Sequence, residues 1–470
     1  MSVFQIKTLQ LILCFALLIV LHEGGHFFFA KLFKVRVEKF FMFFDYKFHL
    51  FSTKDKWFTR LFPKFKNKET EYGIGWIPLG GYVKISGMID ESMDTEQMKQ
   101  PVKDYEFRAK PVWQRFFIMI GGVLVNFLLA LFIYAMILFA WGDDKLPVKS
   151  ITNGFSYNEM AEGVGFQDGD LPVKIDGKDI TYWNDSYLRD ISRASTVTVM
   201  RDGHEVAVLM PDEGLNLIEM TKSATPFMSI NVPAVIDSVL PESPAAKAGI
   251  SKGSRIMGVD GRAIEWWGDF DVIMASKAMQ LAEPDCSRAD SMALRQMTIV
   301  FAANGQSLAE PDTVEITLTE QYMMGIVKTH YAQYYTIEHH DYGFFESLPA
   351  GAAHGWRTLG GYVSDLRYLF TSDGAKNVGS FGTIGNLFPA QFDWQAFWYI
   401  TAFISIMLAF MNILPIPGLD GGHVFFLLVE AVTRRPPSDK FMERAQMVGM
   451  ALLLALMALA LFNDVVKFLF

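Results

Sequence analysis

Four uncharged apolar runs divide this 470-residue chain into membrane-crossing and polar parts. A helix needs about 20 mostly apolar residues to cross the hydrocarbon core of a bilayer. The runs are residues 8–21 with a continuation at 27–30, residues 116–141, residues 394–419 and residues 445–463. The pattern therefore predicts a membrane α-helical bundle of four transmembrane helices.

The overall composition agrees with a membrane protein that carries a sizeable polar part. Hydrophobic residues make up 51% of the chain, charged residues make up 20%, and the mean hydropathy is +0.20. The two cysteines are too few for a cysteine-based metal site. A disulfide between them is not expected, because Cys14 lies in an apolar run and Cys286 in a polar region.

The distribution of Lys and Arg predicts how the spans are oriented. Residues 31–68 contain 11 Lys or Arg against three acids, and the short segment 434–444 adds four more cations. Residues 142–394 carry 19 Lys or Arg against 34 Asp or Glu, a net charge of −15. Because cytoplasmic loops are enriched in cations, residues 31–115 and 420–444 are expected in the cytoplasm. The acidic region and both termini are then outside.

A candidate metal site lies at the end of the first span, in the motif HEGGH at 22–26. His22 and His26 are four residues apart, so on a helix they share one face and can bind one zinc ion. Glu23 is placed to activate a water molecule at that metal. The alternative is a polar helix end that reaches the membrane interface, but such side chains are costly in a span unless they are used.

Asp420, which closes the third apolar run, is the candidate third ligand. A catalytic zinc usually has three protein ligands and a water. The first and third spans run in the same direction, so HEGGH and Asp420 reach the same membrane depth. Pro415 and Pro417 break the helix there. Non-helical backbone at this depth is tolerated only where it lines a polar cavity. The alternative reading of an Asp before two glycines is a turn or a helix cap.

These motifs together resemble the site-2 protease family of intramembrane zinc metalloproteases. The matching segments are HEGGH at 22–26, NILPIPGLDGG at 412–422, GVLVN at 122–126 and GIGWIPLGGYVK at 73–84. In the second span Val123 replaces the proline that is usual in the family. The closest branch is the bacterial sigma-E-regulating protease type, which carries PDZ domains. Residues 52–70 look like an insertion, and a basic membrane-surface segment is the simplest interpretation of them.

The resemblance implies roles for individual residues. His22, His26 and Asp420 would hold Zn²⁺ and Glu23 would be the catalytic base, with the neighbouring His423 not a ligand. A membrane-associated β segment would hold the substrate. The implied substrate-binding residues are Asn126, Asn412, Gly80, Gly81, Tyr82 and Val83.

The acidic region contains an internal repeat. Residues 165–180 align without gaps with residues 249–264, an offset of 84 residues, which is about the size of a small β-rich domain. The Asp-Gly pairs at 176–177 and 260–261 are expected to form hairpin turns. The pattern resembles PDZ domains, which bind extended peptides at a sheet edge, although two spacer domains that bind nothing remain an alternative. Residues 342–370 are expected to form an amphipathic helix on the membrane surface or on a domain.

The chain is thus expected to be a four-span zinc endopeptidase with two extracytoplasmic PDZ-like α+β domains, in a bacterial inner membrane. Its substrates would be single-span membrane proteins already shortened by an upstream site-1 type protease, such as anti-sigma factors or remnant signal peptides. The lipid bilayer is a further expected partner, and no nucleic acid is expected. A catalytically inactive PDZ scaffold and a metal transporter are the alternatives, and the set of His22, Glu23, His26 and Asp420 argues against both.

The predicted segments are 1–30 (first transmembrane helix), 31–112 (cytoplasmic and re-entrant β region), 113–141 (second transmembrane helix), 142–228 and 229–322 (PDZ-like domains), 323–393 (amphipathic helix and connector), 394–422 (third transmembrane helix), 423–444 (cytoplasmic loop) and 445–470 (fourth transmembrane helix).

Overall fold

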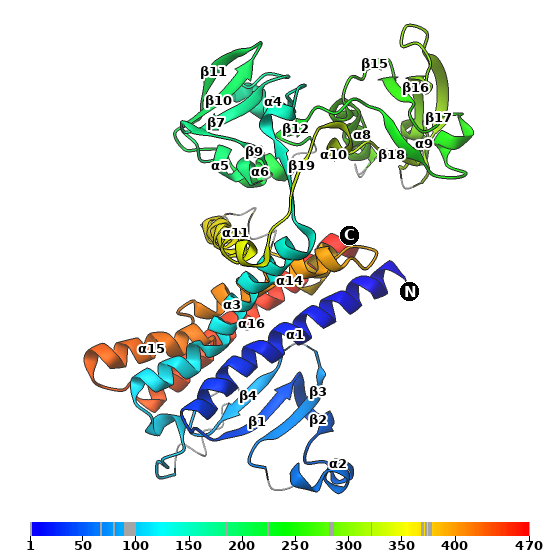
Figure 1. Ribbon diagram of the computed structural model, residues 1–470. Coiled ribbons are helices and arrows are strands. Elements are labelled where there is room, and N and C mark those ends of the chain that lie inside the picture. The colour runs from blue at the N-terminus through cyan, green and yellow to red at the C-terminus, as the bar shows by residue number, and fades with distance from the viewer. Residues whose placement is uncertain are drawn as a thin grey trace. The chain divides into compact units, whose positions relative to one another are not determined.

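The computed structural model divides into two compact units, which are described separately. Unit 1 comprises Met1–Gly142 and Asp341–Phe470, and unit 2 comprises Asp143–His340 (Figure 1). The structure describes residues 2–65, 68–78, 80–88, 100–184, 186–222, 225–281, 286–320, 322–367, 371, 374 and 378–469.

Unit 1 contains the four helices that are long and apolar enough to span a membrane, which confirms the four predicted spans. They are α1 (Val3–Leu32), α3 (Val112–Trp141), α14 (Trp394–Ile413) and α16 (Asp439–Leu469). Local sequence sets their ends. Ser2 and Gln5 form a capping box at the start of α1, and Gly142 ends α3 with a φ of 66°.

The central helix of unit 1 is α3, which packs against α1, α14, α11 (Phe344–Asp365) and α15 (Asp420–Thr433). Glycines make the contact with α1 unusually close. A Cβ built on Gly25 would lie 2.3 Å from the carbonyl oxygen of Gly121, so no larger residue fits there. Small residues let helix backbones approach in membranes, where packing replaces the hydrophobic effect as the driving force.

One helical segment differs from its sequence-based expectation. The third span is helical only to Ile413, and after an irregular turn α15 begins at Asp420, so residues 423–433 are helical rather than loop. The expected amphipathic helix is α11, and it packs on α3 and α14: Gly351 lies against Ala135. Shorter elements of the unit are α2 (Lys56–Leu61), η1 (Pro63–Phe65), η3 (Phe107–Ala109) and α13 (Phe381–Leu387).

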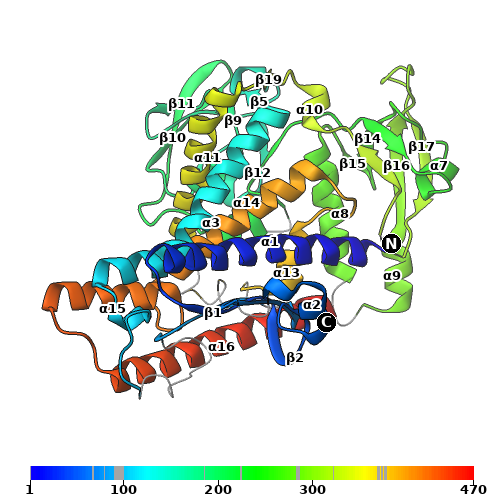
Figure 2. The same cartoon turned by 60° about the horizontal axis from the view of Figure 1, so that its bottom comes forward.

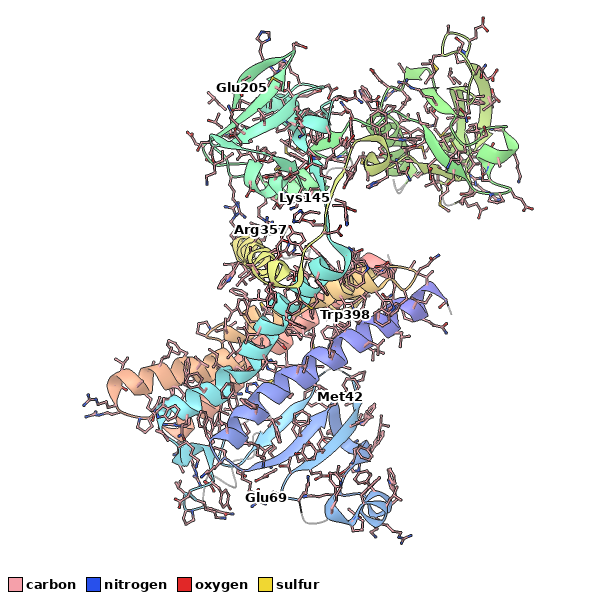
Figure 3. All side chains as sticks on the ribbon, viewed as in Figure 1. Met42, Glu69, Lys145, Glu205, Arg357 and Trp398 are labelled. Carbon is pink, nitrogen blue, oxygen red and sulfur yellow. The ribbon has the colours of Figure 1, made fainter. Side chains whose placement is uncertain are left out.

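A four-stranded sheet lies along α1 (Figure 2). Its order is β2-β3-β1-β4, with β1 parallel to β3 and antiparallel to β4. The strands are β1 (Val37–Met42), β2 (Phe44–Ser52), β3 (Glu71–Ile77) and β4 (Tyr82–Ile85). Residues 52–70, the presumed insertion, join β2 to β3 and contain α2 and η1. Figure 3 adds the side chains, with Met42 at the end of β1 and Trp398 on α14.

Unit 2 contains two sheets of the same topology, one for each sequence repeat. The first has the order β11-β10-β7-β8 and the second the order β17-β16-β14-β15. Asp176-Gly177 and Asp260-Gly261 have positive φ at both positions and connect paired strands, so the predicted hairpin turns are confirmed. The repeat therefore corresponds to a duplicated β-rich structural element, and one continuous apolar core runs through the unit.

The strands of unit 2 are short, and most of its helices are too. In chain order the strands and helices are β5 (Asp143–Pro147), η4 (Val148–Ser150), β6 (Phe155–Tyr157), α4 (Glu159–Val164), β7 (Leu171–Ile175), β8 (Lys178–Asp179), β9 (Tyr182–Trp183), α5 (Tyr187–Ile191), β10 (Thr196–Arg201), β11 (His204–Leu209), α6 (Leu217–Lys222), β12 (Met228–Ile230), β13 (Ile236–Val239), α7 (Pro244–Lys247), β14 (Arg255–Val259), β15 (Arg262–Ala263), α8 (Trp267–Leu281), α9 (Arg288–Arg295), β16 (Gln296–Ala302), β17 (Asp312–Thr317), β18 (Ile326–Lys328), α10 (Tyr331–Tyr334) and β19 (Glu338–His340).

Candidate functional site

Three side chains from two distant segments converge inside unit 1. The Nε2 atoms of His22 and His26 lie 3.3 Å apart. The Oδ2 atom of Asp420 lies 3.1 Å from the first of these nitrogens and 3.3 Å from the second. The structure thus brings together the three predicted metal ligands, and in the described part of the chain they form the single His/Cys/Asp/Glu cluster able to hold a metal ion.

The spacing of these three atoms suits zinc. Ligands bound at about 2.0–2.1 Å in a tetrahedron are about 3.3 Å from one another, which is close to the three observed separations. Asp420 Oδ2 is buried and, among the described residues, accepts no hydrogen bond. A buried carboxylate oxygen without a donor is costly unless a cation meets it. The donor set of two imidazoles and one carboxylate therefore fits a zinc site.

Backbone breaks place Asp420 opposite the two histidines. The α14 helix ends at Ile413, Gly418 adopts a φ of 100°, and Asp420 is the first residue of α15. The two following glycines allow this turn, because a Cβ on Gly421 would lie 2.3 Å from the Leu414 oxygen. The other end of α15 is held by an ion pair between Glu430 and Arg115 of α3, with an N–O distance of 2.6 Å.

The histidine rings are oriented by atoms behind them. His26 Nδ1 lies 2.8 Å from the carbonyl oxygen of Ile118, which fixes this nitrogen as the protonated one and leaves Nε2 free to bind a metal. Sequence reasoning missed this contact, because a backbone carbonyl leaves no trace in side-chain pattern.

Asn126 stands behind the other ring. Its Nδ2 atom is placed 3.4 Å from His22 Nδ1, while its Oδ1 atom is buried without a hydrogen bond in the described part of the chain. Amide oxygen and nitrogen are assigned from the hydrogen-bond network, and exchanging them brings the Asn126 oxygen to His22 Nδ1. His22 Nδ1–H then donates to Asn126 Oδ1, which again leaves Nε2 free. The geometry favours a role in holding His22, whereas a contact between Asn126 and substrate stays a prediction.

A glycine of α3 makes room for the ligating nitrogens. A Cβ on Gly122 would lie 2.5 Å from His26 Nε2 and 2.8 Å from His22 Nε2. The two rings can occupy these positions only because residue 122 has no side chain. Gly122 was noticed in the sequence only as the start of a motif, and its contact with the rings depends on how α1 and α3 pack.

A cavity of about 810 Å³ opens onto the three ligands. Glu23 and Asn412 line it, and the amide nitrogen of Asn412 lies 3.5 Å from His22 Nε2. The backbone of Val83 is within hydrogen-bonding reach of the Glu23 carboxylate. The structure therefore places the predicted base and the predicted loop in one cavity, together with Gly80, Gly81 and Tyr82.

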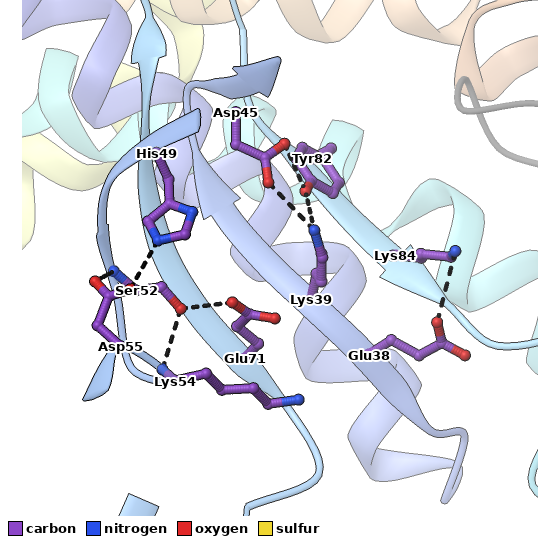
Figure 4. Close-up of polar contacts among 10 residues, drawn as sticks. All are labelled: Glu38, Lys39, Asp45, His49, Ser52, Lys54, Asp55, Glu71, Tyr82 and Lys84. Carbon is purple, nitrogen blue, oxygen red and sulfur yellow. Dashed lines mark hydrogen bonds and ion pairs between the residues drawn. The ribbon is translucent and has the colours of Figure 1, made fainter. Parts of the chain in front are cut away.

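The loop before β4 is pressed against α1 and the sheet. A Cβ on Gly81 would lie 2.6 Å from the Ile19 side chain and 2.8 Å from the Phe41 oxygen. The Tyr82 ring stacks between Phe41 and Phe44, at centroid distances of 5.6 and 6.3 Å. Its hydroxyl donates to Asp45 (2.9 Å), which is also paired with Lys39 (Figure 4). The strand that borders the cavity is therefore held rigidly.

Comparison with known proteins agrees with this site. The profile described as "Peptidase family M50" matches residues 10–456. The chain is 28% identical over 484 residues to "Regulator of sigma-E protease RseP" of Escherichia coli (strain K12), covering 96% of this chain and 97% of that protein. It is 28% identical over 486 residues to "Regulator of sigma E protease" of Haemophilus influenzae, covering 97% and 98% of the two chains. A "Putative zinc metalloprotease" of Vibrio cholerae is 27% identical over 480 residues, with 96% and 97% covered. The chain belongs to peptidase family M50, and it is a membrane-embedded zinc metalloendopeptidase of the site-2 protease type.

Proposed function

We propose that His22, His26 and Asp420 hold the catalytic zinc ion and that Glu23 is the base of an intramembrane peptide hydrolysis. The observation that carries this proposal is the triangle of ligand atoms, with sides of 3.1, 3.3 and 3.3 Å, at the wall of a cavity that Glu23 shares. Bound zinc supplies Lewis acidity and lowers the pKa of a water molecule. The Glu23 carboxylate accepts a proton from the attacking water and returns it to the leaving amine.

Asn412 and the 80–83 loop would position the substrate. The Asn412 amide nitrogen lies 3.5 Å from His22 Nε2. It is therefore placed to donate a hydrogen bond to the scissile carbonyl as negative charge develops there. A membrane helix must unwind before it is cut, and strand pairing satisfies the freed backbone groups. The backbone of residues 80–83 borders the cavity next to Glu23, which supports this loop as the pairing site.

The ligand assignment is tested by Asp420→Ala in purified full-length protein. We expect zinc content to fall strongly, because only two imidazoles remain. Asp45→Ala is the matched control, since Asp45 lines the same cavity without belonging to the ligand cluster. Full zinc occupancy and normal peptide cleavage in Asp420→Ala would remove Asp420 from the site.

Loop pairing is tested separately by Val83→Pro, which should slow cleavage and keep zinc, with Val83→Ile as its control.

The finer biological role is also proposed. The protein would reside in a bacterial inner membrane, with its active site near the cytoplasmic face and unit 2 in the periplasm. Unit 2 would consist of two PDZ-like domains. Substrates would be single-span membrane proteins, such as anti-sigma factors or remnant signal peptides, after an upstream protease has removed their exterior part. The names of the sigma-E-regulating relatives support this class of substrate.

Unit 2 would act as a size filter on substrates, with recruitment of their trimmed ends as the competing role. The chain offers a clean deletion, because His340 of β19 is paired with Asp143 of β5 and a short linker can therefore replace residues 143–340. A filter predicts that this deletion, folded and zinc-loaded, begins to cut untrimmed substrates. A recruiter predicts that it stops cutting trimmed ones.

A further inference from the structure

An exposed aromatic surface lies on strands β2 and β3 of unit 1. The exposed side chains Tyr46, Phe48 and Leu50 occupy alternate positions of β2, and Trp76 of β3 is exposed beside them. Phe48 and Trp76 stack with centroids 5.1 Å apart, and Trp76 Nε1 donates to the backbone carbonyl oxygen of Tyr46 at 2.8 Å. These apolar groups are thus fixed in place while they face outward. This surface, together with the outward face of α2, is called the aromatic patch below.

The presumed insertion extends the aromatic patch. Phe58 of α2 contacts the rings of Phe51, Phe62 and Phe65 and so ties α2 and η1 to β2. The Trp57 ring contacts Phe51 and Phe58 at the edge of this small core but stays 59% exposed, and Leu61 is 66% exposed. A folded segment that hides one set of aromatic rings and displays another is built to contact an apolar phase.

Cations surround the aromatic patch. Residues 46–68 contain seven Lys or Arg and one acid, a net charge of +6. The acid, Asp55, is engaged by His49 at 2.9 Å and by the Ser52 amide at 2.9 Å (Figure 4). Four of the cations lie on and around α2 and form no ion pair within the described ranges: Lys54, Lys56, Arg60 and Lys64.

We propose that the aromatic patch docks on the anionic phospholipid headgroups of the membrane leaflet next to it. Aromatic rings with a polar edge settle at the headgroup level, and clustered Lys and Arg are attracted to anionic lipids. The patch belongs to the same compact unit as the four helices that could span a membrane. Docking would fix β2, and through β3 and β1 it would steady β4 at the cavity. This inference is independent of the proposed catalytic roles.

The test uses the full-length protein in nanodiscs of phosphatidylcholine alone or with about one third phosphatidylglycerol. An environment-sensitive fluorophore is attached at Leu61→Cys after Cys14 and Cys286 have been replaced. We expect blue-shifted emission and protection from quenching by the neutral quencher acrylamide in the anionic nanodiscs, and clearly weaker protection in the neutral ones. The quadruple variant K54Q/K56Q/R60Q/K64Q should lose this lipid dependence. A matched control, R434Q/R435Q/K440Q/R444Q, removes four cations elsewhere in unit 1 and should keep it.

Equal acrylamide quenching in both lipids, in the labelled protein without charge substitutions, would overturn the proposal. If the probe is accessible in both, the patch faces water and suits a soluble partner. If it is protected in both, the contact is apolar and does not recognise headgroup charge. Neither result depends on the folding of the quadruple variant.

Discussion

A single methyl group added at Gly122 should disrupt the metal site. In Gly122→Ala the new Cβ would lie 2.5 Å from His26 Nε2 and 2.8 Å from His22 Nε2. Non-bonded carbon contacts are comfortable at about 3.5–4.0 Å, so the overlap is close to 1 Å. Retreat of the α3 backbone is opposed by α14, which packs against it and whose Ser405 hydroxyl donates to the backbone oxygen of Asn126 at 2.7 Å. The histidine rings must therefore move.

Such overpacking costs about 1–3 kcal/mol. If the rings give way, this energy appears in metal binding as a loss of about 5- to 150-fold in zinc affinity, at about 1.4 kcal/mol for each factor of ten. The assay is the zinc content of purified protein equilibrated over a series of buffered free zinc concentrations. Gly24→Ala, in the HEGGH motif, is the control, because a Cβ at Gly24 meets nothing within 4 Å. Wild-type zinc affinity in Gly122→Ala would refute the ring geometry described above.

Three further substitutions test contacts around the site and in unit 2. Asn126→Leu should weaken zinc binding about 10- to 100-fold, since groups that orient metal ligands have effects of this size, while Asn126→Asp should retain most of it; equal zinc titrations for the two variants would contradict the contact with His22. Asp464→Asn should lower the free energy of unfolding by about 2–3 kcal/mol, because this buried carboxylate accepts hydrogen bonds from the backbone and hydroxyl of both Ser380 and Thr383. An unchanged melting temperature would count against this prediction. Asp170→Asn should destabilise unit 2 by about 3 kcal/mol, because it leaves Arg201 without its two-pronged partner at 2.6 and 2.7 Å; protease resistance of unit 2 equal to wild type would argue otherwise.

The sequence alone was sufficient for the spans and for the residues that gather at the site. Apolar run length determined the four spans, and the four-residue spacing of His22 and His26 placed them on one helix face. Asp420 followed from the shared direction of two spans. Each of these predictions depends on chain direction or on a helical repeat, and both can be read from the amino-acid sequence alone.

The contacts that shape the site depend on packing, and the sequence could not supply them. The fit of Gly122 against the rings requires the distance between α1 and α3, and the partner of Asn126 requires their rotation. The end of α14 at Ile413 was also missed, because the residues after it stay apolar through Leu419. The fold of residues 52–65 depends on contacts between Phe58 and its neighbours, which no periodic pattern reveals.

Replacement of Glu23 by Gln tests the central claim most directly. Purified wild-type and Glu23→Gln proteins would be reconstituted in lipid, loaded with zinc, and given a single-span peptide whose cut site is identified by mass spectrometry. Because Glu23 lines the cavity but lies outside the ligand cluster, the variant should keep its full zinc content. The account predicts a cut within the transmembrane segment by the wild type and none by Glu23→Gln. Cleavage by the zinc-loaded variant at a rate close to that of the wild type would contradict it.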